Sequence, residues 1–391
     1  MFQLLKIFLV CCSLFIISGC WDSKDIEELA MEVGAALDKT NAPISSLDQG
    51  YRKKNIIKMT LQNISPKSSP QSDKGGQQQK YENVTGSGDS ILEIFREISL
   101  KKDVPPYGAH LKILVIGEKL VKEKNLQILL ALFDRTFEVR DSCIILIAKG
   151  SAAQTLKLAT DVPAFTLVGI EKNRYRSVKM LPAIRLGKVM SNMADHANFI
   201  IQSTSTKKRK VKFNGGAIIK GNTNRLIGFL NEDEVAGLNF ITGEIKGGII
   251  TGRDPKTHGL ISYEISSVKS KIIPHLDGEH ISFDVNIESE GRLNEEHVHA
   301  GNAFANKFLK RAEMAIKKEV EHLVHQSLNK LQKKYQIDVA GFNEQMRIQF
   351  PKEWLQLEKD WDKRFSQAPI KSHVSITIRD YMIKGKKEIS D

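Results

Sequence analysis

The chain has few cysteines, and they are unevenly placed. Of the four cysteines in 391 residues, Cys11, Cys12 and Cys20 lie near the amino terminus and only Cys143 follows. Because a disulfide needs two thiols within bonding distance, no internal disulfide can form after Cys20. That part of the chain must be stabilised by a core. Its 41% hydrophobic and 27% charged residues are typical of a globular protein.

Long hydrophobic runs are also missing after residue 20. No later segment approaches the roughly 18 apolar residues of a membrane-spanning helix. The one apolar run, Ile7–Ile17, follows a single Lys6 and precedes small residues, which is typical of a secretory signal. It is too short to cross about 30 Å of hydrocarbon comfortably. We therefore expect an exported chain whose remaining residues form an ectodomain.

The signal ends in Ile17-Ser18-Gly19, directly before Cys20. This arrangement lets a lipoprotein-processing peptidase act at the cysteine, where diacylglycerol is attached to the sulfur and the chain is cut before it. We predict that residues 1–19 are removed and that Cys20 is lipidated; an uncleaved anchor helix with a chance cysteine is the alternative. Two acyl chains hold a protein stably on a membrane. The single remaining thiol suits an exported protein of a single-membrane bacterium.

The chain also has fewer acidic than basic residues. The formal net charge is +12, which fits nucleic acid, or a surface of anionic lipid headgroups and cell-wall polymers. Export argues against nucleic acid. The basic run Lys207–Lys210, with Lys212 just beyond, is interpreted as a solvated hairpin or linker, or alternatively as a patch that faces lipid headgroups.

Apolar strands and helical patterns alternate in the first half of the chain, which favours an α/β domain with a mixed sheet covered by helices. The predicted strands are Leu29–Leu37, Asn55–Ile64, Tyr81–Thr85, Leu111–Ile116, Cys143–Ala148 and Phe199–Thr204. The predicted helices are Asp89–Leu100, Val121–Phe133, Ala152–Ala159 and Leu186–Ala197.

The second half favours an α+β domain with an antiparallel sheet and a long helix. The predicted strands are Phe213–Ile219, Leu226–Leu230, Gly247–Thr251, Gly259–Lys269, His280–Glu288 and Ser372–Arg379. A short helix is predicted from Glu232 to Asn239 and a long one from Glu295 to about Tyr335. The apolar stripe of the long helix comprises Phe304, Phe308, Ala315, Ile316, Leu323, Val324, Leu328 and Leu331.

These patterns divide the chain into four segments. We predict a signal peptide at 1–19, an N-terminal α/β domain at 20–206, a middle hairpin–helix subdomain at 207–254 and a C-terminal α+β domain at 255–391. The tryptophans Trp354 and Trp361 are expected to pack helices of the last segment on its sheet.

No catalytic, cofactor or metal constellation is recognisable. The turn Thr85–Asp89 lacks the third glycine and the lysine of a phosphate-binding loop, so a plain strand-to-helix turn is expected. Cys143 lies in an apolar strand where a thiolate would be costly. The candidate metal ligands are His297, His299, His322 and His325, but no cysteine or third ligand stands near them. We predict no catalytic, cofactor-binding or metal-binding residue, and Cys20 as the one modified residue.

Three segments resemble the Ger(x)C family, the C-subunit lipoproteins of spore germinant receptors. Cys20–Ala30 is similar to the mature start of the family, and Gly215–Lys220 followed by Gly228–Leu230 to the start of its carboxy-terminal region. Asp338–Phe342, with Pro351, Trp354, Trp361 and Phe365, looks like its closing pattern.

The resemblance implies a non-enzymatic C subunit, anchored through diacylglyceryl-Cys20 at the outer face of the cell membrane and, in spores, at the inner membrane. It also implies two integral-membrane partners, of A and B type, with which the subunit triggers germination in response to nutrients. It leaves open whether this subunit binds the germinant. Composition and motifs alone would also allow a solute-binding lipoprotein or a cell-wall-associated hydrolase.

Overall fold

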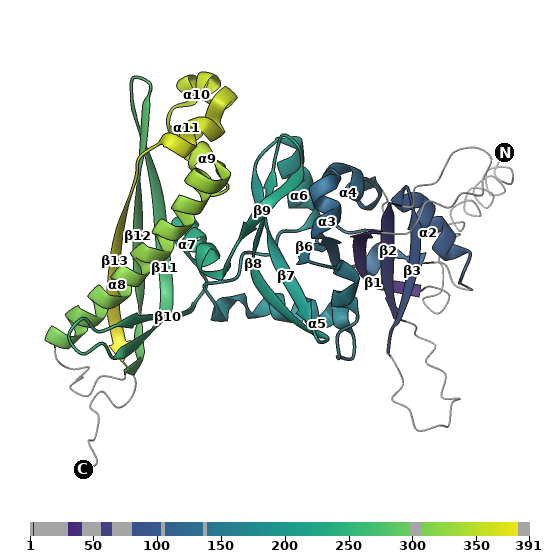
Figure 1. The fold of residues 1–391 in the computed structure, drawn as a ribbon, viewed down its shortest axis with the longest axis horizontal. Helices are drawn as coiled ribbons and strands as arrows, with labels where there is room; N and C mark the ends of the chain where they lie inside the picture. The colour runs from purple at the N-terminus through teal and green to yellow at the C-terminus, as the bar shows by residue number, and fades with distance from the viewer. Residues whose placement is uncertain are drawn as a thin grey trace, which may run out of the picture.

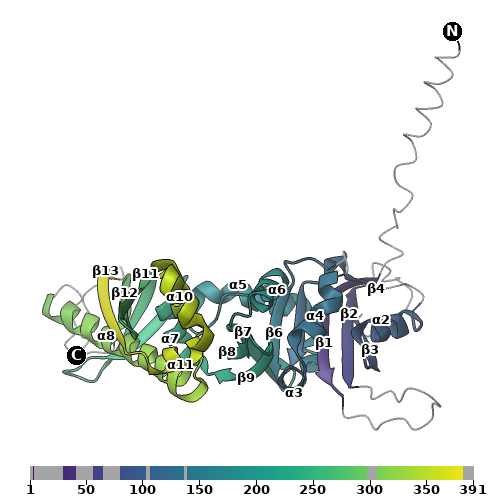
Figure 2. The ribbon, with the colours of Figure 1, turned by 90° about the horizontal axis from the view of Figure 1, so that it is seen from above.

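The computed structural model describes Gln3 and residues 30–40, 56–64, 80–102, 106–135, 139–296 and 306–381. Two β-sheets lie at opposite ends of an elongated molecule (Figure 1). Seen from above, the elements follow one another along the long axis, from β2 and β3 at one end to α8 and β13 at the other (Figure 2). No helix in the described ranges is long and apolar enough to cross a membrane. Cys20, His297 and His299 lie outside these ranges.

The larger sheet has the strand order β3-β2-β1-β5-β6-β7-β8-β9, with β4 paired to β1. Its centre is parallel, because β1, β5, β6 and β7 run in the same direction, and antiparallel hairpins extend it on both sides. The strands are β1 (Ala30–Lys39), β2 (Ile57–Ile64), β3 (Glu82–Gly88), β4 (Pro106–Tyr107), β5 (Ile113–Gly117), β6 (Ile144–Lys149), β7 (Phe199–Lys207), β8 (Lys210–Lys220) and β9 (Arg225–Leu230).

Helices cover both faces of this sheet. On one face lie α2 (Ile91–Ser99), α3 (Glu118–Glu123), α4 (Leu126–Arg135) and α6 (Leu186–Ala194). On the other lie the 3-10 segment η3 (Ala152–Leu156) and α5 (Pro163–Lys172), which is followed by η4 (Asn173–Arg176); another 3-10 turn, η2 (Gly108–His110), precedes β5. All five residues of β5 are therefore buried, as expected for a central parallel strand.

The smaller sheet has the order β10-β11-β12-β13. Its strands are β10 (Gly248–Arg253), β11 (Leu260–Asp277), β12 (His280–Glu296) and β13 (Ile370–Tyr381). Its helical elements are α7 (Glu232–Thr242), α8 (Asn306–Asn329), the π-helical η5 (Lys330–Tyr335), α9 (Phe342–Gln349), α10 (Pro351–Leu357), η6 (Glu358–Asp360) and α11 (Trp361–Gln367).

Helix α7 joins the two sheets through one continuous core. Asn231 caps its first turn, and Glu234 completes a reciprocal capping box. A Cβ atom at Gly237 would lie 2.0 Å from the Leu323 carbonyl oxygen, so only glycine lets α7 approach α8 this closely. The core accordingly runs from Ile218 of β8 through α7 to the small sheet.

The predicted combination of an α/β and an α+β part is confirmed, with one difference in the small sheet. Strand β13 pairs with β12 in parallel, not antiparallel as predicted, because the chain crosses from the end of β12 back to its beginning through α8–α11. The predicted boundaries after residues 206 and 254 stay predictions. The structure adds that β8 and β9 pair with the large sheet, and that Lys207–Lys210 forms the turn of the β7–β8 hairpin.

Two shorter helices also differ from their predictions. The predicted helix Val121–Phe133 is divided into α3 and α4, because the chain bends at Lys124 and the Asn125 side chain accepts the Gln127 N–H at 2.7 Å. The predicted helix Ala152–Ala159 is the short 3-10 segment η3.

The long helix begins later than predicted. Glu295 belongs to β12, which pairs with β11 as far as Glu296, and the helix is described from Asn306 onward. Its predicted stripe is confirmed where it is described: Phe308, Ala315, Ile316, Leu323, Val324, Leu328 and Leu331 are all buried. Phe304 lies outside the described residues.

Candidate functional site

A cleft of about 1250 Å³ lies where the two parts of the molecule meet. One wall comes from the large sheet: α6, the start of β7 and the β8–β9 turn. The other wall comes from the helical segment between η5 and β13. The charged side chains that line the cleft include Arg185, Lys188, Glu344, Arg347 and Lys359. Because both signs of charge and both parts of the chain contribute, the cleft is suited to contact another polypeptide or a polar ligand.

Asn198 connects the two walls. Its Nδ2 donates a hydrogen bond to Asp362 Oδ1 at 2.9 Å, and its Oδ1 accepts the Gly221 N–H at 2.9 Å. Burial raises the pKa of Asp362, and this is opposed by the charge of Lys220 and by the bond from Asn198. One amide therefore ties the β8–β9 turn of the large sheet to α11 of the small one.

A buried carboxylate shapes the second wall. Asp338 is 3% exposed and accepts backbone N–H groups from Ala340, Gly341 and Asn343 at 2.9, 3.1 and 2.7 Å. It also accepts the Trp361 indole N–H at 3.0 Å. Burial of the carboxylate raises the pKa of Asp338 above its usual value, and the hydrogen bonds that it accepts offset only part of this rise. The turn before α9 is thus fixed to the beginning of α11.

The tryptophans of this wall pack as predicted. Trp361 meets the Phe283 ring of β12 edge-on, with centroids 6.3 Å apart, and Trp354 meets Trp361 at 5.0 Å. Their rings hold α10 and α11 on the small sheet. Trp354 and Trp361 also line the cleft, so its shape depends on this packing.

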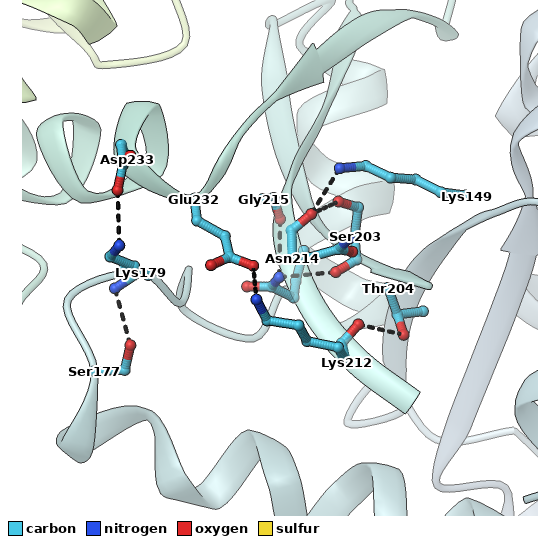
Figure 3. A network of polar contacts seen from close by, with 11 residues as sticks. Lys149, Ser177, Lys179, Ser203, Thr204, Lys212, Asn214, Gly215, Glu232 and Asp233 are labelled. Carbon is cyan, nitrogen blue, oxygen red and sulfur yellow. Dashed lines mark hydrogen bonds and ion pairs between the residues drawn. The ribbon is translucent and has the colours of Figure 1, made fainter. Parts of the chain in front are cut away.

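A polar network around the first turn of α7 forms a second link between the large-sheet and the small-sheet parts of the molecule (Figure 3). Lys179 pairs with Asp233 at 2.7 Å, and Lys212 pairs with Glu232. Lys149 Nζ donates to the Asn214 carbonyl oxygen at 2.7 Å. Burial lowers the pKa of the Lys149 amine, and neighbouring glutamates, Glu232 first, act against this. The acidic first turn of α7 is therefore held by lysines from the large-sheet side.

Tyr335, the last residue of η5, supplies a third link. Its hydroxyl accepts the Phe229 N–H and donates to the Phe229 carbonyl oxygen, both at 3.0 Å. A Cβ atom at Gly228 would lie 2.2 Å from the Tyr335 ring, so glycine is needed there. Lys330 adds an ion pair to Glu234 at 2.9 Å. These contacts hold η5 against strand β9 and helix α7.

The predicted metal candidates do not form a site in the described ranges. His322 Nε2 is 2.8 Å from Gln326 Nε2, within its own helix, and His325 is exposed. No group of three or more His, Cys, Asp or Glu side chains in those ranges could hold a metal ion. Asp284 bonds to two other histidines, at 2.8 and 3.1 Å, which sequence reasoning missed. His275 and His373 approach the two different oxygens of this carboxylate from the strands on either side of β12.

Two further sequence candidates have structural roles. Burial raises the pKa of the Cys143 thiol to about 12, so it stays protonated at neutral pH. The segment Thr85–Asp89 is not the plain turn expected, because Thr85–Gly88 complete strand β3; the chain then passes through Asp89 into α2, whose N-cap is Ser90. Cβ atoms at Gly86 and Gly88 would each lie 2.9 Å from Ile94, so these glycines allow close packing of α2 on β3.

Comparison with known families accounts for nearly the whole described chain. Residues 22–205 match the family "Spore germination protein N-terminal domain", and residues 214–382 match "Spore germination B3/GerAC like, C-terminal". The chain belongs to the GerAC-like family of spore germination proteins. The Ger(x)C resemblance seen in the sequence is thereby confirmed.

Relatives of known sequence or structure support this membership. The chain is 35% identical to spore germination protein YndF of Bacillus subtilis (strain 168), covering 97% of each chain. It is 32% identical to spore germination protein B3 of the same organism, covering 95% of this chain and 96% of B3. The crystal structure of the GerBC protein matches with a TM-score of 0.62 and 28% identity, over 91% of this chain and 100% of that one.

The cleft combines the two matched family segments. Asn198 belongs to the first and Asp362 to the second, and the Asp338 turn belongs to the second as well. Sequence reasoning singled out the Asp338–Phe342 and Trp354–Phe365 segments but did not bring them together with α6. No local pattern signals a contact between residues 164 positions apart.

Proposed function

We propose that this member of the GerAC-like family is the C subunit of a nutrient germinant receptor. In this proposal it is tethered by diacylglyceryl-Cys20 to the outer face of the cell membrane, and in spores to the inner membrane. It acts there with two integral-membrane subunits, of A and B type, to trigger germination. The carrying observation is that matches to spore germination families span residues 22–382.

The tether is supported by the sequence around Cys20. An apolar segment too short to span a membrane ends at Gly19-Cys20, and no described helix could span one in its place. Two acyl chains at about 0.8 kcal/mol per buried methylene are sufficient for stable attachment. Integral-membrane partners then meet this subunit at the membrane surface.

We further propose that the cleft is the surface used by a partner subunit. It is built from both family segments, and Lys188 on one wall and Lys359 on the other are both exposed. Reversing these charges with Lys188→Glu and Lys359→Glu should abolish the nutrient response while protein abundance in spore membranes stays normal. Lys318→Glu on α8, outside the cleft, serves as the matched control. A normal nutrient response of the double variant would contradict the use of the cleft.

The tether is tested by Cys20→Ala. We expect a chain that is poorly processed or released from membranes when they are washed at high salt. Salt is needed because the basic chain can also adhere to anionic lipid electrostatically. Full retention of Cys20→Ala after the wash would contradict lipidation at this residue.

A solute-binding lipoprotein and a cell-wall-associated hydrolase are the alternatives. A solute-binding protein would be expected to have two similar lobes around a hinged pocket. The nine-stranded and four-stranded sheets differ in topology, which disfavours that reading. A hydrolase would need an acid–base pair or a metal site converging in a cleft, whereas the cleft carboxylates Asp338 and Asp362 accept structural hydrogen bonds.

A further inference from the structure

The turn between β7 and β8 has an unusual composition for its backbone conformation. Lys208 and Arg209 both have positive φ, at 48° and 58°, in a two-residue hairpin whose flanking pair is Lys207 and Lys210. Such turns strongly favour Asn-Gly, because residues with larger side chains are strained at positive φ. Strain at two basic residues in succession favours a role for their side chains beyond turn stability.

The basic side chains of this turn, Lys207–Lys210, are exposed and lack acidic partners in the described structure. None of the four forms an ion pair with a described carboxylate, whereas Lys212 just beyond pairs with Glu232. Arg209 Nε donates to the Lys157 carbonyl oxygen at 3.0 Å, and the Ala159 N–H donates to the Arg209 carbonyl oxygen at 3.2 Å. The turn is therefore held in place through the side chain and the carbonyl group of Arg209, while the charges of Lys207, Lys208 and Lys210 remain available.

The contacts of Arg209 place this turn near the beginning of β1. Arg209 and Lys157 line a small hollow together with Glu82. Glu82 of β3 pairs with Asn63 of β2, which pairs with Glu32 of β1, two residues from Ala30. Neighbouring strands are spaced by about 4.8 Å, so two steps across the sheet are roughly 10 Å. Glu82, which lines the hollow together with the turn residue Arg209, thus lies roughly 10 Å from Glu32, near the start of β1.

The tether can bring this region to the membrane. Cys20 precedes Ala30 by ten positions, which an extended chain can span over at most roughly 35 Å. Cations near an anionic lipid surface are attracted to it, and the attraction falls off within a Debye length of about 8 Å. An exposed basic turn on a tethered ectodomain can therefore make a second, electrostatic contact with such a surface.

From these observations we infer that the Lys207–Lys210 turn binds anionic phospholipid headgroups and fixes the orientation of the ectodomain on the membrane. The inference rests on the proposed lipid tether at Cys20. It selects the second of the two interpretations that the sequence allowed for this basic run. The contact is electrostatic and involves no covalent step.

The experiment uses the mature lipoprotein in vesicles of phosphatidylcholine and phosphatidylglycerol in equal parts. A fluorophore is attached to Lys208→Cys or, as a control, to Lys318→Cys on α8, the helix that lies along the small sheet (Figure 1). Cys143 is 1% exposed and stays unlabelled. Quenching by lipids that carry a nitroxide on the headgroup reports which site lies at the membrane surface.

We expect strong quenching at position 208 and little at 318, with the quenching at 208 lost in phosphatidylcholine alone or at about 1 M salt, where the Debye length is about 3 Å. Adding Lys207→Gln and Lys210→Gln should also abolish quenching at 208. The matched pair Lys307→Gln and Lys310→Gln, exposed on α8, should leave it unchanged.

Two outcomes would overturn the inference. Protein that stays with the vesicles but shows equal quenching at 208 and 318 would keep the tether and refute the orientation. Protection of position 208 that requires the integral-membrane subunits and not anionic lipid would assign the turn to a protein partner. Protein that does not stay with the vesicles would instead refute the tether, and with it the proposed function.

Discussion

The two sheets bury their strands in different ways. The central strands of the large sheet are covered on both faces, so every residue of Ile113–Gly117 is buried. The strands of the small sheet are covered on one face only, so Gly248–Arg253 alternates strictly between buried and exposed residues. The difference follows from topology: parallel strands require crossovers that place helices on the faces, whereas an antiparallel hairpin can leave one face to solvent.

The different covering of the two sheets determines which of their surfaces remain open to a partner. The large sheet is enclosed by its own helices, and its free surfaces are turns and edges, such as the β7–β8 and β8–β9 turns. The small sheet presents a polar face on which Glu290 pairs with Arg379 and Asp284 with two histidines. The cleft lies apart from this polar face, between α6 and the β8–β9 turn on the large-sheet side and the helices α9–α11 on the other.

The largest expected effect concerns the helix that covers the small sheet. Phe308→Ala should lower the free energy of unfolding by about 3–5 kcal/mol and Leu323→Ala by about 2–5 kcal/mol, because both side chains are buried in the core. Lys318→Ala, exposed on the same helix, should change it by less than about 0.5 kcal/mol. Denaturant unfolding measures all three. Unchanged stability of Phe308→Ala combined with loss of partner capture would mean that the stripe is an exposed docking surface.

Alanine substitutions at neighbouring residues of one strand test whether the large sheet is covered on both faces and the small sheet on one. In β6, Ile145→Ala and Leu146→Ala should each cost about 2–5 kcal/mol, because both faces are covered. In β12, Ile287→Ala should cost a similar amount, but Glu288→Ala should cost less than about 0.5 kcal/mol. Thermal or denaturant unfolding of the four variants gives the pattern. A mild effect of Leu146→Ala would show that the second face of the large sheet is not packed as described.

A smaller effect is expected at the carboxylate of the cleft wall. Asp338→Asn keeps an acceptor oxygen but presents an N–H₂ group to buried donors, so we expect a loss of about 1–3 kcal/mol. Because the Trp361 indole bonds to Asp338, tryptophan fluorescence should change as well. Phe365→Leu, in the same core, provides a control for general loosening of the packing. Wild-type stability and fluorescence of Asp338→Asn would contradict the role assigned to the carboxylate.

Local patterns predicted much of this fold. The apolar runs of β5 and β6 and the stripe of α8 were recognisable because burial on two faces or on one helical face leaves a distinct periodicity. The predicted helix start at Glu295 was wrong. Glutamate has a high helix propensity, but here Glu295 and Glu296 extend strand β12 and pair with β11. Tertiary pairing overrode local preference at this point.

The cleft could not be predicted in the same way. The bond between Asn198 and Asp362 and the docking of Tyr335 on Phe229 depend on how distant segments pack, and neither residue pair carries a local signal. The Asp338 segment was noticed only through its resemblance to a family. The parallel pairing of β13 was missed for a related reason, because it depends on the path of the whole α8–α11 connection.

The central claim, that this chain is a subunit of a nutrient germinant receptor, is tested most directly by the germination of spores that lack it. We predict that such spores form normally, fail to respond to one class of nutrient, and still germinate with a chemical trigger that bypasses the receptors. A chromosomal copy of the intact gene should restore the nutrient response. Normal germination with every nutrient tested, or a defect in sporulation or vegetative growth instead, would contradict the account.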